Sequence, residues 1–510
     1  MDLGYLQNLL LSTLAWQTSL SLVVFWATAL AGFLALKRIT ARSRKERKRL
    51  PPGPNGVPIL GYIPFIRKPF HIVFKELSEE YGPIFRLRLG SKDVVVLNDL
   101  TSVREGLANP DVLYRPDDFI FRYLGVRGIL TMNGEPWQVN RRYCFHVLRN
   151  LGFAKKPMEE HIQEEVQCFT DLLSSSKGQP ITVGKTLAAS VANNISALVF
   201  GQRYDLNDPK GRSIEDLLTG FLRHSSFLSV VDFLPAIRTL TAYIPRTKTS
   251  ITSYIFKEFI QLVRNEVKER EGNMELYMER DFIDGYLRKM EENKGAKSHY
   301  SLRYLEGTAV NLYGASTNTV RSTILWNLYI SANDPAGQQR KLQHEIDSVV
   351  GSQRAPRWED RHQMPFTMAS IFETLRWRTM APISIHRAAG RDTVIGGYDV
   401  PAGTLVVPNL WSIHNDPEHW CNPSEYNPTR FLNEDGTKVE DKPQAFVPFS
   451  LGRRACPGES LALMEIFLYL TTILQKFSVL PEEGRTVSLD VQHVLISAPN
   501  DMQRLRFIAR

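Results

Sequence analysis

The sequence predicts a mainly helical protein with a minor β part, behind one N-terminal transmembrane helix. Three observations predict it: an almost uncharged N-terminal stretch, helical periodicity over most of the remainder, and strand-like alternation in two short segments. With 510 residues, of which 43% are hydrophobic and 23% charged, the chain can bury a large core. This composition excludes a disordered or fibrous protein.

The N-terminal stretch, residues 1–36, contains a single charged side chain, Asp2. As a helix, residues 14–36 would extend about 34 Å, enough to cross a hydrocarbon core of about 30 Å. A basic cluster follows, made of Lys37, Arg38, Arg42, Arg44, Lys45, Arg47, Lys48 and Arg49. Because basic residues stay on the cytosolic side of a membrane, we expect a retained anchor with the rest of the chain in the cytosol.

The basic cluster also carries most of the formal net charge of +8. Its eight positive charges, less the negative charge of Glu46, leave the rest of the chain with a net charge of only +1. This excludes a basic nucleic-acid-binding body. The four cysteines include no Cys-x-x-Cys pair, which argues against a zinc cluster and a disulfide scaffold. The sequon at Asn194 should stay unmodified in a cytosolic body.

Two segments of the body are predicted to contain strands. Residues 51–58 come first and are too rich in proline for a helix or a central strand, so they are expected to form a rigid link. Residues 84–97 alternate around a Gly-Ser-Lys-Asp turn, which predicts a β-hairpin. A second β-rich stretch, residues 393–407, is punctuated by glycine and proline.

The longest helical pattern spans residues 302–334 without a break. Gly307 and Gly314 lie within it, although glycine inside a helix costs about 1 kcal/mol relative to alanine. A central helix that passes close to a flat group explains a small residue at such a position. We therefore expect this helix to cross the middle of the body.

The residues with the clearest chemical meaning surround Cys456. Four residues stand at fixed offsets around it: Phe449, Gly452, Arg454 and Gly458. A long apolar helix begins at Glu459, and a cysteine just before a helix N-terminus is favoured as thiolate by the helix dipole and by adjacent arginines, here Arg453 and Arg454. The glycines let backbone approach a large flat ligand, on which Phe449 can pack. A buried inert cysteine, the alternative, requires none of these residues.

These residues match every fixed position of the haem-binding signature Phe-x-x-Gly-x-Arg-x-Cys-x-Gly, and the chain resembles the cytochrome P450 superfamily. It looks most similar to the animal microsomal branch, which oxidises drugs, steroids and fatty acids. The resemblance implies the cytochrome P450 fold, with Cys456 as axial ligand to the iron of haem b (iron protoporphyrin IX). On this basis the chain divides into an N-terminal anchor at 1–36, a basic and proline-rich hinge at 37–61, and one catalytic domain at 62–510.

Other family landmarks follow in the expected order. Glu373 and Arg376 form Glu-x-x-Arg, which in the family joins an arginine, here Arg430, in a structural core near the haem. Alone, such a pair is usually a solvated helix face. Trp137 and Arg141 resemble a haem-propionate contact, although an amphipathic helix with one buried tryptophan would look the same. The resemblance implies three further propionate-binding residues: Arg115, His386 and Arg454.

In the family, the long central helix carries Ala/Gly-Gly-x-Asp/Glu-Thr, which we align with residues 313–317. Gly314 would then open space for dioxygen, and the Thr317 hydroxyl would help to deliver protons during oxygen activation. Ser316 replaces the acid, and a serine cannot relay charge as a carboxylate does. We expect either less coupled oxygen activation, with more reducing equivalents lost to peroxide, or compensation by water.

The resemblance implies a haem-thiolate monooxygenase of the endoplasmic reticulum membrane, with a lumenal N-terminus, that inserts one oxygen atom from O2 into a lipophilic substrate. No Gly-x-Gly-x-x-Gly opens a helix after a strand, so electrons must come from a partner. The family implies NADPH–cytochrome P450 reductase, with cytochrome b5 as a second candidate. Aromatic residues within 119–123 and 227–235 fall in family regions that line the pocket, although such clusters are often simple core.

Two alternative functions remain open. One is a haem-thiolate isomerase or dehydratase that acts on a peroxide without reductase, favoured by Ser316 and disfavoured by Thr317. The other is a non-catalytic, membrane-tethered haem or sterol binder. The sequence leaves open the substrate, the position oxidised, the choice between a biosynthetic and a detoxifying role, and the oligomeric state.

Overall fold

A computed structural model describes residues 49–116, 124–150, 155–205, 233–271, 280–294, 298–493 and 496–510, with positions 32, 152, 216, 217, 219 and 220. Apart from Gly32, the predicted anchor at 1–36 lies outside the described residues. Among the helices that the structure does describe, none is both long and apolar enough to cross a membrane. The chain separates into two compact units, and the larger one, Pro52–Gly396 with Val400–Arg510, is the folded body.

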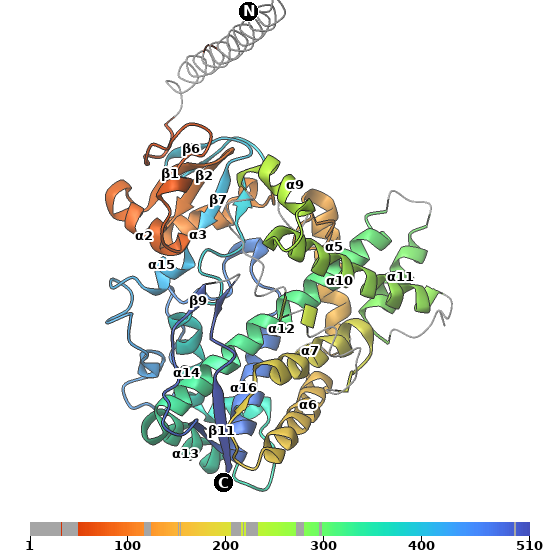
Figure 1. The fold of residues 1–510 in the computed structure, drawn as a ribbon, viewed down its shortest axis with the longest axis vertical. Helices are drawn as coiled ribbons and strands as arrows, with labels where there is room; N and C mark the ends of the chain where they lie inside the picture. Colours follow the sequence, from red (N-terminus) through yellow and green to blue (C-terminus); the bar gives the residue numbers. More distant parts are fainter. Residues whose placement is uncertain are drawn as a thin grey trace, which may run out of the picture. The chain divides into compact units, whose positions relative to one another are not determined.

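The body is mainly helical, as predicted (Figure 1). Its helices are α2 (Phe70–Tyr81), α3 (Leu100–Ala108), α5 (Gly134–Asn150), α6 (Lys156–Ser175), α7 (Gly184–Phe200), α9 (Pro235–Tyr243), α10 (Lys248–Glu271), α11 (Phe282–Glu292), α12 (Leu302–Asn333), α13 (Arg340–Val349), α14 (Pro365–Trp377), α15 (Leu410–His414) and α16 (Glu459–Lys476). The strands are β1 (Ile84–Leu89), β2 (Lys92–Leu97), β3 (Ile181–Thr182), β4 (Arg387–Ala388), β5 (Thr393–Ile395), β6 (Tyr398–Val400), β7 (Leu405–Pro408), β8 (Phe477–Pro481), β9 (Gln492–His493), β10 (Ser497–Ala498) and β11 (Arg504–Ala509).

The largest sheet joins both segments in which strands were predicted. Its order is β1-β2-β7-β4, with β1 and β2 paired antiparallel as the expected hairpin and β2 paired parallel with β7. Strand β4 closes the sheet against β7 and carries Arg387. Phe85 and Leu87 of β1 and Val94 and Val96 of β2 are buried in one apolar cluster with Phe74 of α2, which holds the sheet to this helix.

Helix α12 crosses the middle of the body and packs against α7, α10, α14 and α16 (Figure 1). Ser301 caps its N-terminus by accepting the Tyr304 N–H at 3.3 Å, and Pro335 follows its end. A side chain at Gly307 would lie 2.4 Å from the Arg127 carbonyl carbon, so close packing requires glycine there. The single long helix predicted over residues 302–334 is therefore present.

The proline-rich stretch does not stand apart from the body. Pro52 O accepts the Arg86 N–H of β1 at 2.7 Å, and Gly61 pairs with Leu89 at the end of the same strand. A side chain at Gly53 would overlap the Arg86 carbonyl. Residues 52–61 are thus attached to the sheet, although the sequence suggested a hinge that reaches residue 61.

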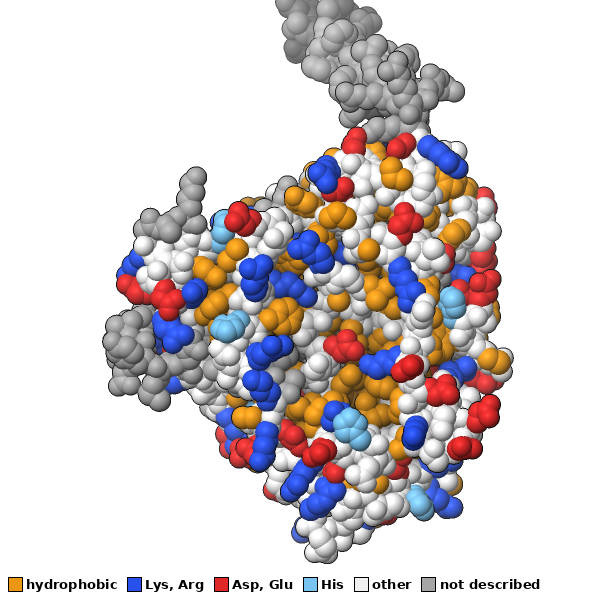
Figure 2. All heavy atoms as spheres, turned by 180° about the vertical axis from the view of Figure 1, so that it is seen from behind, with side chains coloured by type: hydrophobic (Ala, Val, Ile, Leu, Met, Phe, Trp, Pro, Cys, Tyr) orange, Lys and Arg blue, Asp and Glu red, His pale blue; other side chains and the backbone are white. Residues whose placement is uncertain are grey.

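On the face shown in Figure 2, basic side chains are interspersed with acidic and apolar ones. This mixed surface is typical of a protein body with little net charge. The sequon at Asn194 is not on a surface: Asn194 is fully buried in α7, and its Nδ2 donates to Tyr469 Oη at 3.4 Å. Because the folded protein cannot present Asn194 to a glycosylating enzyme, the sequon does not report on topology.

Helix α16 carries a buried acid whose charge the core does not compensate. Glu465 is 1% exposed, Oε2 has no hydrogen-bond partner among the described residues, and burial raises the pKa of its carboxyl well above the usual value. The folded protein therefore holds a proton that the unfolded chain releases above about pH 4.3. It follows that this group's contribution to stability is present at low pH and is lost as the pH rises.

Replacing Glu465 with leucine is expected to stabilise the protein by on the order of 1 kcal/mol at neutral pH, because it removes an unpartnered polar group. The gain should shrink as the pH is lowered toward 5, where keeping the wild-type carboxyl protonated costs less. Thermal unfolding of both proteins at pH 5.5 and 7.5 measures the difference. A Glu465→Leu protein that is equally or less stable at both pH values would contradict the uncharged carboxyl.

Candidate functional site

Cys456 lies in the turn that leads into α16. A single 3-10 turn, Gly452–Arg454, precedes it, and the Cys456 N–H donates to Phe449 O at 2.9 Å. Gly452 has φ +74° and a side chain there would meet Leu107 O at 2.4 Å, so only glycine fits. The N–H of Gly458, the residue before α16, donates to Cys456 Sγ at 3.4 Å. The sulfur is therefore held at a helix N-terminus, as the sequence predicts.

Cys456 is accessible, although protein atoms surround its side chain. Its side chain is exposed, yet burial has the largest influence on the thiol and raises its pKa. The Gly458 N–H and Arg141 lower the pKa but do not outweigh burial, so protein groups alone favour the thiol. The expectation that Arg453 and Arg454 favour the thiolate is therefore corrected, because neither is among the groups that lower the pKa of Cys456.

Arg454 does not act on the sulfur because its guanidinium points elsewhere. It donates to Leu113 O at 2.9 Å and Met132 O at 2.6 Å, and it lies 3.9 Å above the Trp137 ring. The Trp137 ring is buried, and its Nε1–H has no hydrogen-bond partner among the described residues. An unpartnered indole N–H in a protein interior is a donor that remains available to a ligand.

Three other arginines share this region with Arg454. Arg141, one turn after Trp137 on α5, donates to Ala455 O at 2.8 Å, next to Cys456. Arg115 donates to the carbonyls of Ile385 and His386, both at 2.6 Å. Arg387 of β4 donates to Leu451 O at 2.9 Å, inside the Cys456 loop. The structure thus places Arg115, Trp137, Arg141 and Arg454 close together and adds Arg387, whereas His386 joins them through its backbone carbonyl.

The four arginines form a buried positive cluster without a counter-charge. Among the described residues none of them forms an ion pair with an acid, although only Arg141 is appreciably exposed. Burial, with repulsion from the other arginines, lowers the pKa of Arg454 to about 9 and that of Arg387 to about 10, and lowers that of Arg115 well below its usual value. Holding such a cluster is costly unless anions enter it.

The expected Glu-x-x-Arg core is fully assembled. The Glu373 carboxylate accepts two hydrogen bonds of 2.7 Å from Arg376 and one of 3.3 Å from Arg430, and both members of the pair are fully buried. Arg376 also donates to His414 O at 2.8 Å and Pro423 O at 2.9 Å. These bonds join α14 to the long segment that precedes the Cys456 loop.

The expected role of Thr317 is not supported by its position. Thr317 is fully buried and donates to Tyr313 O at 3.1 Å, and Ser316 Oγ donates to the same carbonyl at 3.2 Å. By contrast, Ala315 and Thr319 are accessible, one turn apart on one face of an otherwise buried stretch. Since residues two positions apart point about 200° apart around a helix, Thr317 lies on the opposite face.

Moving the family pattern two residues along α12 matches its first and last positions to Ala315 and Thr319. Ser316 then replaces the glycine, and Asn318, a buried neutral residue, replaces the acid. The sequence alone admits both alignments because neither contains a carboxylate. Gly314 still borders open space, since no atom outside its own helix lies within 4 Å of a side chain built there.

Comparison with known proteins identifies the family. The cytochrome P450 family model matches residues 51–504. The chain belongs to the cytochrome P450 family. This P450 is 34% identical to cytochrome P450 2H1 of Gallus gallus over 466 residues, 90% of this chain and 93% of the relative. It is 32% identical to cytochrome P450 18a1 of Drosophila melanogaster over 89% of this chain and 86% of the relative, and 36% identical to cytochrome P450 2G1 of Oryctolagus cuniculus over 85% and 88%.

Cytochromes P450 carry a haem bound through a cysteine thiolate, and the residues of this P450 fit that group. Cys456 provides an accessible thiol at the N-terminus of α16. The uncompensated arginines and the unpartnered Trp137 N–H provide what two buried carboxylates need. Arg387 was missed from the sequence, where the only available signal was its position next to His386.

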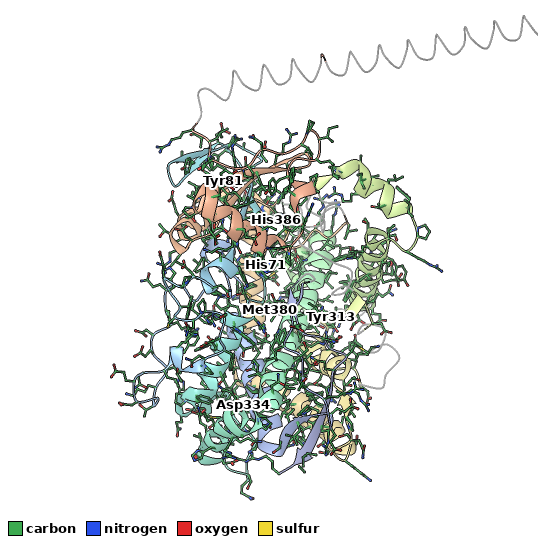
Figure 3. The ribbon with its side chains drawn as sticks, turned by 60° about the vertical axis from the view of Figure 1, so that its left-hand side comes forward. His71, Tyr81, Tyr313, Asp334, Met380 and His386 are labelled. Carbon is green, nitrogen blue, oxygen red and sulfur yellow. The ribbon has the colours of Figure 1, made fainter. Side chains whose placement is uncertain are left out.

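The sequence also placed two aromatic segments, 119–123 and 227–235, at the pocket, and the structure describes only the end of the second. Residues 119–123 and 227–232 lie outside the described residues. Phe233 is 1% exposed and packs in the core with Phe70 and Phe74 beneath the sheet, so it is a core residue. Figure 3 shows His386 near the sheet, with Tyr313 lower in the body on α12.

Proposed function

We propose that this P450 is a haem-thiolate monooxygenase that inserts one oxygen atom of O2 into a lipophilic substrate. The observation that carries this proposal is the accessible Cys456 sulfur close to a buried arginine cluster that has no counter-charge in the described protein. When bound, haem supplies the one-electron and oxygen chemistry that no side chain provides. The chain's own residues hold that group, exclude water around it and deliver protons.

Each part of the site then has a role. Cys456 would bind the haem iron, and the Gly458 N–H at 3.4 Å would stabilise negative charge on its sulfur. Arg115, Arg387 and Arg454, with the Trp137 N–H, would hold the two propionate carboxylates, which would also relieve the repulsion among the cations. Phe449 anchors the ligand loop through its carbonyl. The Glu373–Arg376–Arg430 core keeps that loop and α14 in register.

Thr319 is the residue we assign to proton delivery in place of Thr317. Its hydroxyl lies on the accessible face of α12, donates to Ala315 O at 2.8 Å and still has lone pairs to accept a proton donor. Asn318 cannot pass on a proton as a carboxylate would. Oxygen activation is therefore expected to lose more reducing equivalents to peroxide than in a P450 with an acid at this position.

Electrons and location follow the family. We assign NADPH–cytochrome P450 reductase as the electron donor, with cytochrome b5 as a second candidate, because no dinucleotide-binding motif is present in the chain. The apolar residues 14–36 and the basic cluster favour a single-pass anchor in the endoplasmic reticulum membrane, with the catalytic domain in the cytosol.

The proposal is tested with the full chain in a membrane that contains the reductase, using an O-alkylated coumarin as a lipophilic probe. A thiolate-type carbon monoxide spectrum and product that depends on both NADPH and reductase are expected. Product formed from an organic peroxide alone, with none from NADPH, would favour an isomerase or dehydratase. Haem binding without any product across a panel of lipophilic probes would favour a non-catalytic binder.

The assignment of Thr319 predicts a difference between two matched variants. Thr319→Val should lower the product formed per NADPH by roughly tenfold and raise peroxide release, because it removes a proton-delivering hydroxyl. Thr317→Val removes a hydroxyl that faces the opposite side of α12 and should leave the ratio unchanged. Product, NADPH and peroxide are measured together in the reductase membrane. The reverse pattern would restore the first alignment.

A further inference from the structure

His414, the last residue of α15, is fully buried and is hydrogen-bonded on both ring nitrogens. Val447 N–H donates to His414 Nε2 at 3.0 Å, and Nδ1 lies 2.8 Å from Thr379 Oγ1. Burial lowers the pKa of the imidazole to about 3, so the ring is neutral. A neutral ring that accepts at Nε2 must carry its proton on Nδ1, which donates to Thr379.

With this tautomer, His414 belongs to a closed ring of hydrogen bonds that includes Arg376 of the buried Glu373–Arg376 ion pair. The Thr379 hydroxyl donates a hydrogen bond to Arg376 O at 2.9 Å, and the Arg376 guanidinium donates one to His414 O at 2.8 Å. The same guanidinium is fixed by Glu373 through two hydrogen bonds of 2.7 Å. The imidazole therefore cannot turn without breaking its bond to Thr379, whose hydroxyl is itself bonded to Arg376 O.

On its other side His414 holds the start of the ligand loop. Val447, whose N–H it accepts, closes a turn by accepting the Ser450 N–H at 3.0 Å, and Ser450 has φ +63°. Between them in the chain, Phe449 accepts the Cys456 N–H at 2.9 Å. A serine at positive φ persists only where its surroundings impose that conformation. The bond from Val447 to His414 fixes the residue at which this strained turn begins.

We propose that His414 is a positioning residue. By linking the Glu373–Arg376 core to the Cys456 loop through hydrogen bonds, it would keep the Cys456 sulfur bound to the iron. This rests on the proposed function, in which Cys456 is the axial ligand. Groups that orient a metal ligand from outside its coordination sphere commonly change metal affinity about 10–100-fold when removed. His414 would act in this way through its three hydrogen bonds, with the Val447 N–H, the Thr379 hydroxyl and the Arg376 guanidinium.

The test compares three variants of the full chain as the reduced carbon monoxide complex. His414→Phe keeps an aromatic ring to pack against Phe446 but offers no acceptor to Val447. His414→Gln offers a side-chain oxygen at a similar reach. Tyr426→Phe is the control, because it removes another hydrogen bond to α14, the partly buried one from Tyr426 Oη to Ser370 O at 3.1 Å.

The readout is the rate at which the thiolate-type absorption converts to the form that has lost the thiolate. We expect His414→Phe to convert about tenfold faster than wild type, with His414→Gln and Tyr426→Phe close to wild type. Melting temperatures are measured alongside, since a purely structural role predicts that the rate follows stability. Equal rates for His414→Phe and Tyr426→Phe, or no rescue by glutamine, would overturn the inference.

If His414→Phe takes up no haem, Thr379→Val serves as the second variant. It keeps the imidazole but removes the acceptor that orients it, so faster conversion than wild type is again expected; a wild-type rate would overturn the inference. A wild-type protein without the thiolate-type absorption would overturn the proposed function and this inference with it. A stable thiolate absorption in wild type and in every His414 variant would overturn the inference alone.

Discussion

Replacing Cys456 with alanine is expected to abolish the thiolate-type absorption of the reduced carbon monoxide complex and all NADPH-dependent turnover. Cys456 is the one cysteine that joins an accessible sulfur to a helix N-terminus and the arginine cluster, among the described residues. The loss should be complete, because alanine has no atom that can coordinate iron. The measurement is the difference spectrum of membranes that contain equal amounts of wild type and variant.

Cys421→Ala is the matched control, because Cys421 is also exposed. Its backbone carbonyl accepts a hydrogen bond from Arg430, and alanine keeps that carbonyl. It should keep the wild-type spectrum and turnover. A folded, haem-loaded Cys456→Ala protein that still shows the thiolate-type absorption would mean that another residue is the ligand. The monooxygenase mechanism built on Cys456 would then be wrong.

Glu373→Gln is expected to destabilise the protein by about 3–5 kcal/mol and to prevent haem retention. The carboxylate accepts hydrogen bonds from Arg376, Arg430 and the Asn427 N–H, so removing its charge leaves buried Arg376 without a counter-charge. An amide also presents two N–H donors to donors that already point at it. Urea unfolding and the haem content per chain measure the two effects.

Glu418→Gln provides the control for Glu373→Gln. Glu418 is an exposed acid in the segment whose backbone carbonyls accept hydrogen bonds from Arg376 and Arg430. Replacing Glu418 should change neither the unfolding midpoint nor the haem content. If Glu373→Gln unfolds within about 0.5 kcal/mol of wild type, the range of ordinary surface substitutions, the ion pair is not a structural core. The inferred path from Glu373 through His414 to Cys456 would then lose its origin.

Much of the architecture could be predicted because it depends on local patterns. The hairpin at 84–97 and the helix at 302–334 follow from alternation and helical spacing, which are properties of neighbouring residues. The turn that places Cys456 before α16 follows from its glycines, because a positive φ at Gly452 limits what can stand there. Glu373 and Arg376 meet since residues three apart share a helix face.

Other features depend on which faces the packed elements turn toward one another. The family pattern can be aligned to end at either Thr317 or Thr319. Only the packing of α12 against its neighbours decides which of the two side chains is accessible. The pKa of Cys456 also depends on the whole fold. The local helix dipole and arginines predicted a thiolate, whereas burial raises the pKa and favours the thiol. Local charge cannot reveal how much water a group loses on folding.

By itself, therefore, the sequence determined the element types, the ligand turn and the family signature, since each arises from residues close together in the chain. Only the tertiary structure decided that Arg387 joins the cluster and that His414 lies between the ion pair and Val447. These contacts join residues 33 and 64 positions apart, and no local spacing encodes them. They form because strand pairing and helix packing bring distant segments together, and because a buried polar group that finds a hydrogen-bond partner there avoids the cost of desolvation.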